Sequence, residues 1–406
     1  MRSLFLLLAL SCLLVSSFAL ASEAQQQPSA EKEWTLLVYI NGNNNLDSYG
    51  AMDINEMEAV GSNSKINVVV QWASMATTTK RLLVKKDNDV NTVTSPILED
   101  LGNVDMGDYR TLIDFIRWGV AKYPAKKYFI DVWNHGSGWH MQLKNQLVAA
   151  GQAKATDISW DEKSGNHITT EQLGQAMAEA AKIIGHKVDL YGSDACLMGM
   201  AEVAAEMSES VETYVGSEET EALKGWPYDT LLQGWNALPN ATSQEVAKVL
   251  VREYVKSYQG GSQGTESSAT MSAYDMSKLG GLNTAVKAFG DRIKKLDKAA
   301  RQKLVSSAES SQKFAYSDYV DVLDFLDQSS KARIEGLEDT TRGLREAAKT
   351  FIIANAATEA YAKAQGLAMW LPTDSYSFDG YSSRYKALRF NAATGWGEAL
   401  QALLAP

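Results

Sequence analysis

Cysteine is scarce in this sequence. The 406 residues include two cysteines, Cys12 and Cys196. Cys12 lies in an N-terminal segment that we expect to be removed, so the mature chain would keep one thiol, which excludes a framework of intrachain disulfides. Exported chains normally pair their cysteines, and an odd thiol therefore indicates either intermolecular pairing or a reactive centre. Cys196 is the first candidate for chemistry.

Long apolar runs are absent after the N-terminus. The run from Leu4 to Val15 is too short to span a membrane, and Ala19–Ala21 after it has the pattern of a signal-peptidase site. We predict a signal peptide over residues 1–21 and an exported protein, periplasmic or extracellular. Processing as a lipoprotein at Cys12 is the alternative, but the residues before Cys12 match that signal poorly.

Positive charge is in deficit. Lys and Arg number 39 against 49 Asp and Glu, which gives a formal net charge of −10. This balance argues against nucleic acid and against an anionic membrane as partners, because both attract basic surfaces. The length allows a large buried core, so the fold needs neither a disulfide nor a structural metal.

Apolar runs alternate with helical patterns along the first half. Residues 22–32 are polar and are predicted to be a disordered leader. The apolar runs cover Trp34–Ile40, Ile66–Trp72, Tyr128–Trp133, Val188–Tyr191 and Thr213–Gly216, and the helical segments cover Asp53–Val60, Tyr109–Tyr123, Gln172–Ile184 and Met200–Met207. Continuous apolar strands predict a parallel sheet with both faces covered, an α/β fold whose ligands bind at the carboxyl ends of the strands.

The second half is predicted to be mainly helical, with two further strands at Ala269–Tyr274 and Leu367–Leu371. We place the boundary between a core of residues 33–238 and a C-terminal region of residues 239–406 at Leu238–Pro239. Residues 139–166 are weakly periodic and rich in Gly, Lys and Asp. We expect them to form a long exposed connection that is open to nicking.

Two predicted strands end in residues that could act together. His135 follows the strand at Tyr128–Trp133, and Cys196 follows the strand at Val188–Tyr191. A thiolate is the attacking species, and an imidazole can take its proton and later deliver it to a leaving amine. The backbone N–H groups of Gly136 and Cys196 are expected to bind the oxyanion. Each side chain also has a structural explanation, but the joint pattern favours catalysis.

Two other kinds of protein fit parts of the sequence. Asp131, His135 and His140 could bind zinc, although ligands five residues apart suit one helix face poorly and this segment is predicted to be strand and turn. The other is a non-catalytic binding module on the same scaffold. Its ligand groove would be lined by the aromatic residues Trp226, Tyr228, Trp235 and Trp370.

Two motifs each follow an apolar strand: His135-Gly136 and Asp194-Ala195-Cys196. Together they resemble the signature of caspase-fold cysteine peptidases. Within that group the chain is similar to the clostripain family. The similarity extends to Trp34–Tyr39, Asn134–Trp139, Trp160–Gly165, Gly192–Gly199, Gly216–Glu219 and Gly225–Tyr228, and more loosely to Met271–Asp275 and Gly366–Pro372. The resemblance implies a caspase-like three-layer α-β-α sandwich with a mostly parallel central sheet and a helical C-terminal region.

The resemblance also implies an endopeptidase in which Cys196 is the nucleophile and His135 is the general base. Its polypeptide substrates would carry Arg or Lys just before the scissile bond. Asp194 would face that cationic side chain, or would instead be a turn residue that caps the following helix. We expect no organic cofactor and a monomeric enzyme.

The predicted substrate pocket departs from the family pattern at Lys224. Family members commonly carry an acidic residue on the loop before the Gly-Trp pair at 225–226, and Trp226 itself is a candidate substrate-binding residue. One possibility is that Glu218, Glu219 or Glu221 supplies the second negative charge while Lys224 points outward. The other is that the pocket has changed its preference to another residue type.

Two further family properties involve the 139–166 connection. Family members are often activated by self-cleavage after a basic residue there, and Lys144 and Lys154 are the candidates. Some relatives need calcium, for which Asp157, Asp161 and Glu162 are candidate ligands. Because their spacing matches no known calcium loop, we expect no metal.

Overall fold

The computed structural model describes residues 31–140, 157–266 and 268–406. The predicted signal peptide and residues 22–30 of the predicted leader lie outside this part of the chain. Lys32, the last residue of that leader, already belongs to the first strand. Within the described ranges, no helix has both the length and the apolar character needed to cross a bilayer.

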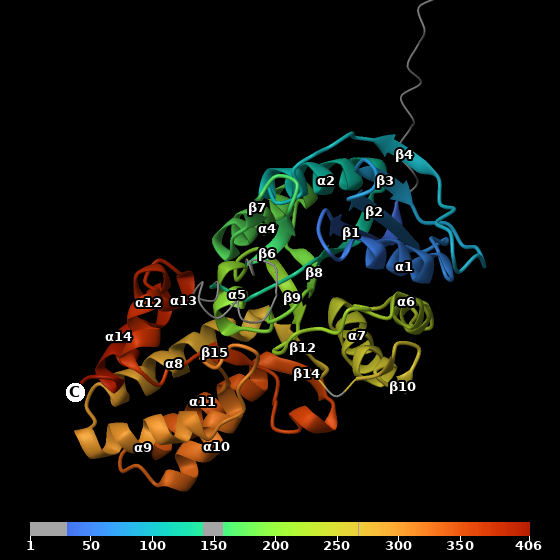
Figure 1. Cartoon of the computed structure of the whole chain (residues 1–406). Coiled ribbons are helices and arrows are strands. Elements are labelled where there is room, and N and C mark those ends of the chain that lie inside the picture. The colour runs from blue at the N-terminus through green and yellow to red at the C-terminus, as the bar shows by residue number, and fades with distance from the viewer. Residues whose placement is uncertain (1–30, 141–156, 267) are drawn as a thin grey trace, which may run out of the picture.

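In the described part of the chain, a sheet of nine strands forms the centre of the fold (Figure 1). The strands are β1 (Lys32–Gly42), β2 (Ile66–Ser74), β3 (Lys80–Leu83), β4 (Ile97–Asp100), β5 (Ala125–Trp133), β8 (Val188–Asp194), β9 (Val211–Gly216), β12 (Thr270–Asp275) and β14 (Ile352–Ala357). Their order is β14-β12-β9-β8-β5-β1-β2-β3-β4. Neighbours from β9 to β2 pair in parallel, and both sides of the sheet end in antiparallel strands.

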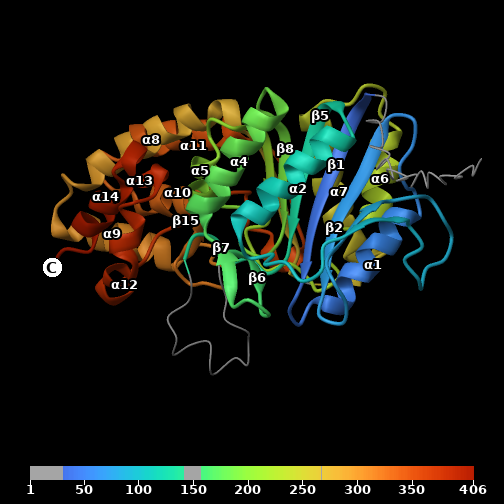
Figure 2. The same ribbon diagram turned by 90° about the horizontal axis from the view of Figure 1, so that it is seen from above.

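Helices cover both faces of the sheet (Figure 2). One face carries α2 (Tyr109–Lys122), α4 (Thr170–Ile184) and α5 (Ala201–Glu206), and the other carries α1 (Asp47–Glu58), α6 (Tyr228–Asn236) and α7 (Ser243–Ser257). Strand β1 shows why both faces must be covered: Leu37 and Tyr39 pack in one hydrophobic cluster, whereas Leu36 and Val38 pack in the other. The predicted three-layer α-β-α sandwich with a mostly parallel sheet is confirmed.

The C-terminal region adds a group of helices beyond the β12 and β14 side of the sheet (Figures 1 and 2). These are α8 (Leu279–Ile293), α9 (Lys298–Glu309), α10 (Val322–Ala332), α11 (Glu338–Phe351), α12 (Ser375–Tyr385), α13 (Arg389–Thr394) and α14 (Trp396–Leu403). The region also contains two 3₁₀ turns, η1 (Met276–Lys278) and η2 (Glu359–Tyr361). Two short strand pairs complete the region: β10 (Gln259–Gly261) with β11 (Gly264–Thr265), and β13 (Tyr319–Asp321) with β15 (Ala368–Trp370). Since β12 and β14 belong to the central sheet, this region completes the core fold.

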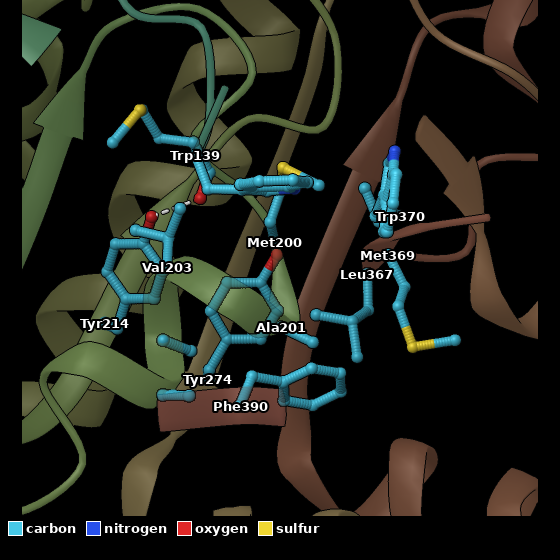
Figure 3. Close-up of a cluster of buried hydrophobic side chains, with 14 of the residues drawn as sticks. Trp139, Met200, Ala201, Val203, Tyr214, Tyr274, Leu367, Met369, Trp370 and Phe390 are labelled. Carbon is cyan, nitrogen blue, oxygen red and sulfur yellow. Dashed lines mark hydrogen bonds between the residues drawn. The ribbon is translucent and has the colours of Figure 1, made fainter. Parts of the chain in front are cut away.

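One hydrophobic cluster continues from the sheet into the C-terminal helices (Figure 3). Tyr214 of β9 packs against Tyr274 of β12 with 5.3 Å between the ring centroids, and Phe390 of α13 belongs to the same cluster. Trp139 packs edge-on against Trp370 with 5.2 Å between the ring centroids. Aromatic pairs of this kind bury large areas and add attraction of their own. The core and the C-terminal region therefore share their packing.

The predicted exposed connection is partly wrong. Residues 141–156 lie outside the described residues, but the segment after them forms a hairpin of β6 (Ile158–Asp161) and β7 (Asn166–Ile168). Asp157, Ser159 and Asp161 are fully buried, as are Trp139 and His140 at the other end. Residues 162–166, at the tip of the hairpin, are exposed as predicted, whereas residues 157–161 are buried through polar contacts with the rest of the chain.

Candidate active site

The ends of β5 and β8 place His135 and Cys196 at one edge of the sheet. Trp133 and Asp194, the last residues of the two strands, are partners in the parallel register. The N–H of Asn134 donates to the carbonyl of Asp194 at 3.1 Å, so the contact continues one residue past the strand. His135 and Cys196 each lie two residues beyond the paired ends. The loop after β5 and the loop after β8 therefore begin side by side at the same edge of the sheet.

Gly136 packs directly against the nucleophile loop. A Cβ atom on Gly136 would overlap the carbonyl oxygen of Cys196 and would lie 3.2 Å from its amide nitrogen and 3.0 Å from the Cβ of Ala195. Glycine permits this approach because it lacks a side chain. The predicted base and the predicted nucleophile thus sit on two loops that touch.

Strand β6 holds the histidine loop from the other side. The N–H of Ser137 donates to the carbonyl of Asp157 at 2.9 Å, and the N–H of Ser159 donates to the carbonyl of His135 at 3.3 Å. The side chain of Asn134 accepts from the N–H of Trp160 at 2.7 Å. This hairpin was missed by the sequence analysis, yet it fixes the backbone on both sides of His135.

Cys196 is partly buried and carries a free thiol. The N–H of Glu221 donates to its Sγ at 3.3 Å. Leu197, the next residue, has a φ of 62°, which is strained for a side chain of this kind and holds the turn that presents the thiol. Burial raises the pKa of Cys196 to about 11, with smaller contributions from the carboxylates of Glu219 and Asp194.

His135 is also partly buried, and its Nε2 atom lies 2.8 Å from Oδ1 of Asn45. Burial lowers the pKa of His135, because the charged imidazolium loses solvation. With a lowered pKa on the base and a raised pKa on the thiol, both groups are neutral at pH 7. Neither group is therefore charged before a reaction begins.

Two backbone N–H groups of these loops lack an acceptor among the described residues. Neither the N–H of Gly136 nor that of Cys196 donates a hydrogen bond to another residue in the described ranges. Unpaired backbone N–H groups are rare in folded proteins unless water or a ligand binds them. These are the two groups that the sequence predicted for an oxyanion.

A pocket of about 430 Å³ is lined by Glu221, the residue whose N–H donates to the thiol. Its lining residues come from distant parts of the chain: Tyr49, Glu221, Ala222, Leu223, Lys224, Tyr258, Gln263, Glu266 and Ser268. Both carboxylate oxygens of Glu221 are buried, and their one hydrogen-bonding partner among the described residues is the carboxyl group of Asp194. Lys224 is exposed, and its Nζ donates to the carbonyl of Gln263 at 3.1 Å.

Asp194 lies behind this pocket. Its carboxylate is buried and accepts hydrogen bonds from the N–H of Trp226 at 3.1 Å and from the hydroxyl of Tyr228 at 2.8 Å. Burial raises the pKa of Asp194 to about 6. Burial followed by the charge of Asp194 raises the pKa of Glu221 well above its usual range. The two carboxyl groups are neighbours, and the pair favours holding a proton.

Comparison with known proteins identifies the family. The sequence profile of the clostripain family matches residues 38–402. The chain belongs to the clostripain family. Clostripain of Hathewaya histolytica is 32% identical over 138 residues, which are 31% of this chain and 24% of clostripain, so the match spans about a quarter of that relative.

Solved structures of the family share the fold. A secreted C11 cysteine protease from Bacteroides thetaiotaomicron, in complex with an irreversible peptide inhibitor, has a TM-score of 0.65 at 19% identity. An inactive zymogen C11 protease from Parabacteroides distasonis has a TM-score of 0.66 at 18% identity. Each comparison covers 90% of this chain and 99% of the other.

Three other predicted pocket residues of this family member lie elsewhere. The carboxyl of Glu218 contacts Asp321 and accepts from the N–H of Gly366 at 3.1 Å. Glu219 accepts from the hydroxyl of Tyr361 at 2.6 Å and from the N–H of Ala315 at 3.2 Å. Trp226 is fully buried and packs against Phe129. Glu218 and Glu219 thus bind the C-terminal region, and Trp226 belongs to the core.

The candidate metal ligands have protein partners instead. Asp157 pairs with Arg384 and accepts from the N–H of Thr170 at 2.7 Å. Asp161 accepts from Asn43 Nδ2 at 2.8 Å and from the N–H of Met106 at 2.9 Å.

The zinc candidates are also separated. Asp131 lies 2.7 Å from the hydroxyl of Tyr228, whose one proton is shared between Asp131 and Asp194, and His140 pairs with Asp318 at 3.2 Å. In the described ranges, no three His, Cys, Asp or Glu side chains are grouped as metal ligands would be. The ligand sets suggested for calcium and zinc are therefore not assembled.

The aromatic groove of the binding-module hypothesis is wrong. Its four residues, Trp226, Tyr228, Trp235 and Trp370, are at most 2% exposed and belong to the hydrophobic core. The candidate cleavage residues Lys144 and Lys154 lie outside the described residues.

Gly136→Ala tests the contact between the two loops. The added methyl group overlaps the backbone of Cys196, so we expect the free energy of unfolding to fall by about 1–3 kcal/mol in chemical denaturation. Gly343→Ala is the matched control, because Gly343 is an exposed helical glycine with open space around it and alanine favours helix. Equal effects of the two substitutions would contradict the contact.

Glu218→Gln tests the buried carboxyl pair. Burial raises the pKa of Glu218 well above its usual value and that of Asp321 to about 6. A carboxyl group whose pKa is higher in the folded state than in the unfolded state contributes its full stability below the pKa of the unfolded state. That contribution is lost as the pH rises through the pKa of the folded state. Glutamine keeps a donor toward Asp321 without this loss, so we expect the Tm to exceed that of the wild type by about 2–4 °C at pH 8 and to match it at pH 5.

The measurement for this pair is thermal unfolding at the two pH values. Glu335→Gln changes an exposed glutamate and should leave the Tm unchanged at both. If the difference in Tm between the Glu218→Gln variant and the wild type is smaller at pH 8 than at pH 5, the protonated pair is disproved.

Proposed function

We propose that the protein is an exported cysteine endopeptidase of the clostripain type, with Cys196 as nucleophile and His135 as general base. The packing of Gly136 against the backbone of Cys196 carries the proposal, because it brings the histidine loop to the thiol. The family match supports the same class of reaction. Polypeptides are the substrates.

The reaction follows from the protonation states. In the free enzyme the thiol and the imidazole are both neutral, so His135 takes the thiol proton as the sulfur attacks the scissile carbonyl. The N–H groups of Gly136 and Cys196 bind the oxyanion. The imidazolium then gives its proton to the leaving amine, and water activated by His135 hydrolyses the thioester.

The pocket beside Cys196 supports a preference for Arg or Lys before the scissile bond. Glu221 provides a buried carboxyl group whose hydrogen-bonding partner is the carboxyl of Asp194, and no basic side chain of the described residues pairs with either group. A guanidinium or ammonium group would supply the missing donors and would favour release of the proton held by the pair. Lys224 lies at the rim and weakens this preference without removing it.

Export and self-processing are parts of the same proposal. The pattern of residues 1–21 is that of a signal peptide, and the Bacteroides thetaiotaomicron relative is described as secreted. We place self-cleavage after Lys144 or Lys154, in the segment between the histidine and cysteine loops. The hairpin β6–β7 begins directly after that segment.

Cys196→Ala and His135→Ala test the two catalytic roles. Loss of the nucleophile should abolish hydrolysis of a fluorogenic peptide, and loss of the base should lower kcat by at least about 100-fold. Intact mass spectrometry should show a single uncut chain for the cysteine variant. His186→Ala is the control, because this histidine is exposed and lies before β8 at the opposite end of that strand from Cys196. Hydrolysis by the Cys196→Ala protein would overturn the proposal.

Glu221→Gln and Lys224→Met test the pocket in opposite directions. The measurement is the ratio of kcat/KM for two peptides that differ only by Arg or Gln before the cut. Loss of the carboxylate should lower the ratio by about 10- to 100-fold, as expected for hydrogen bonds to charged groups. Loss of the rim cation should raise it by up to about fivefold. An unchanged ratio for Glu221→Gln would place the cation-binding group elsewhere.

A further inference from the structure

The asparagine-rich turn at the end of β1, residues 41–45, is held in place by three of its four asparagine side chains. Asn41 Nδ2 donates to Ser159 Oγ at 3.2 Å, and Asn41 Oδ1 accepts from the N–H of Asn43 at 3.1 Å. Asn43 Nδ2 donates to Asp161 at 2.8 Å, as described above. Asn44 Nδ2 donates to the carbonyl of Trp160 at 2.7 Å. All three side chains are buried at 2% exposure or less.

Asn45 is the exception in this turn. It is exposed to solvent, and the contact of its side chain is with the histidine ring: Oδ1 of Asn45 lies 2.8 Å from Nε2 of His135. An amide oxygen can only accept a hydrogen bond, so we infer that the ring donates from Nε2 at this contact. The proton of the neutral imidazole is then on Nε2, and the lone pair is on Nδ1. No described residue hydrogen-bonds Nδ1.

The turn and the histidine loop are also joined through the side chain of Asn134. Asn134 Nδ2 donates to the carbonyl of Asn41 at 2.5 Å, and Asn134 Oδ1 accepts from Trp160 of β6. Asn45 and His135 are therefore attached to the same rigid set of hydrogen bonds. A partner held in this way can select one ring orientation, because rotation of either residue would break the contact.

We propose that Asn45 is a positioning residue that holds His135 in the tautomer protonated at Nε2, with Nδ1 as the basic nitrogen. The proposal rests on the assignment of His135 as the general base. A carboxylate beside the ring would stabilise the charged imidazolium. A neutral amide in the same place fixes the orientation of the ring without that stabilisation. This agrees with burial being the one cause that shifts the pKa of His135 among the described residues. Asn45 acts through the histidine and does not touch the reacting atoms.

The first experiment reads the tautomer directly and does not need activity. In the Cys196→Ala protein, ¹⁵N NMR of the imidazole rings at pH 8 should show His135 protonated at Nε2. Adding Asn45→Ala should shift the His135 nitrogens toward a mixture of tautomers, whereas Ser48→Ala, an exposed change in the adjacent helix, should not. A spectrum that is the same with and without the Asn45 side chain would overturn the proposal.

The second experiment reads the consequence for the reaction. Asn45→Ala should lower kcat by about tenfold or more with little change in KM, because a less ordered base transfers the proton less often. Asn45→Asp places a carboxylate beside the ring and should move the acidic limb of the kcat/KM profile upward by about one pH unit. A purely structural role would lower the Tm and leave the acidic limb of the Asp variant where it is in the wild type, and this result would also overturn the proposal.

The two experiments separate this proposal from the proposed function. If the wild-type protein hydrolyses no peptide, the peptidase assignment fails while the NMR result still decides the contact between Asn45 and His135. If the wild type is active and Asn45→Ala and Asn45→Asp both keep its kcat and its pH profile, the peptidase assignment stands and the role of Asn45 is disproved.

Discussion

The candidate site depends on the parallel pairing of β5 with β8. Nearly all side chains of both strands are buried, so the register cannot slip by one residue without moving every side chain to the opposite face. That register aligns Trp133 with Asp194, and it therefore brings His135 and Cys196 to the same edge although they lie on separate segments of the chain. The surrounding contacts, from Gly136 on one side and from β6 on the other, refine a position that the sheet has already determined.

Three buried carboxyl groups, those of Asp131, Asp194 and Glu221, lie together at this edge of the sheet, and we call them the acidic floor. The hydroxyl of Tyr228 binds both Asp131 and Asp194, at 2.7 and 2.8 Å, and Glu221 lies next to Asp194. Burial raises the pKa of all three acids, so the floor carries less negative charge than its composition suggests. The acidic floor can therefore be stable while it holds protons. A cationic side chain of a substrate would shift the carboxyl groups toward their charged form and would then be attracted to them.

Local patterns in the sequence were sufficient to predict the parallel strands, most of the helices and the two loops of the site. The start of α4, for example, was recognisable from Thr169, whose side chain forms a capping box with Gln172. Contacts between distant segments could not be predicted. Glu218, Glu219 and Glu221 lie within four residues and look alike in the sequence, but the fold directs the first two to the C-terminal region. The asparagines at 41–45 were equally ambiguous, since a turn and a contact with histidine require the same residue type.

Strand β6 has one more consequence, for the integrity of the molecule after proteolysis. It is secured by the guanidinium of Arg384 on Asp157, by its hairpin with β7, and by the bonds between its backbone and the loop at 135–137. None of these attachments needs the polypeptide to be continuous on the N-terminal side of Asp157. A molecule cut there would behave in gel filtration as one particle and would separate into two polypeptides only in denaturant, because β6 would remain hydrogen-bonded to the loop at 135–137.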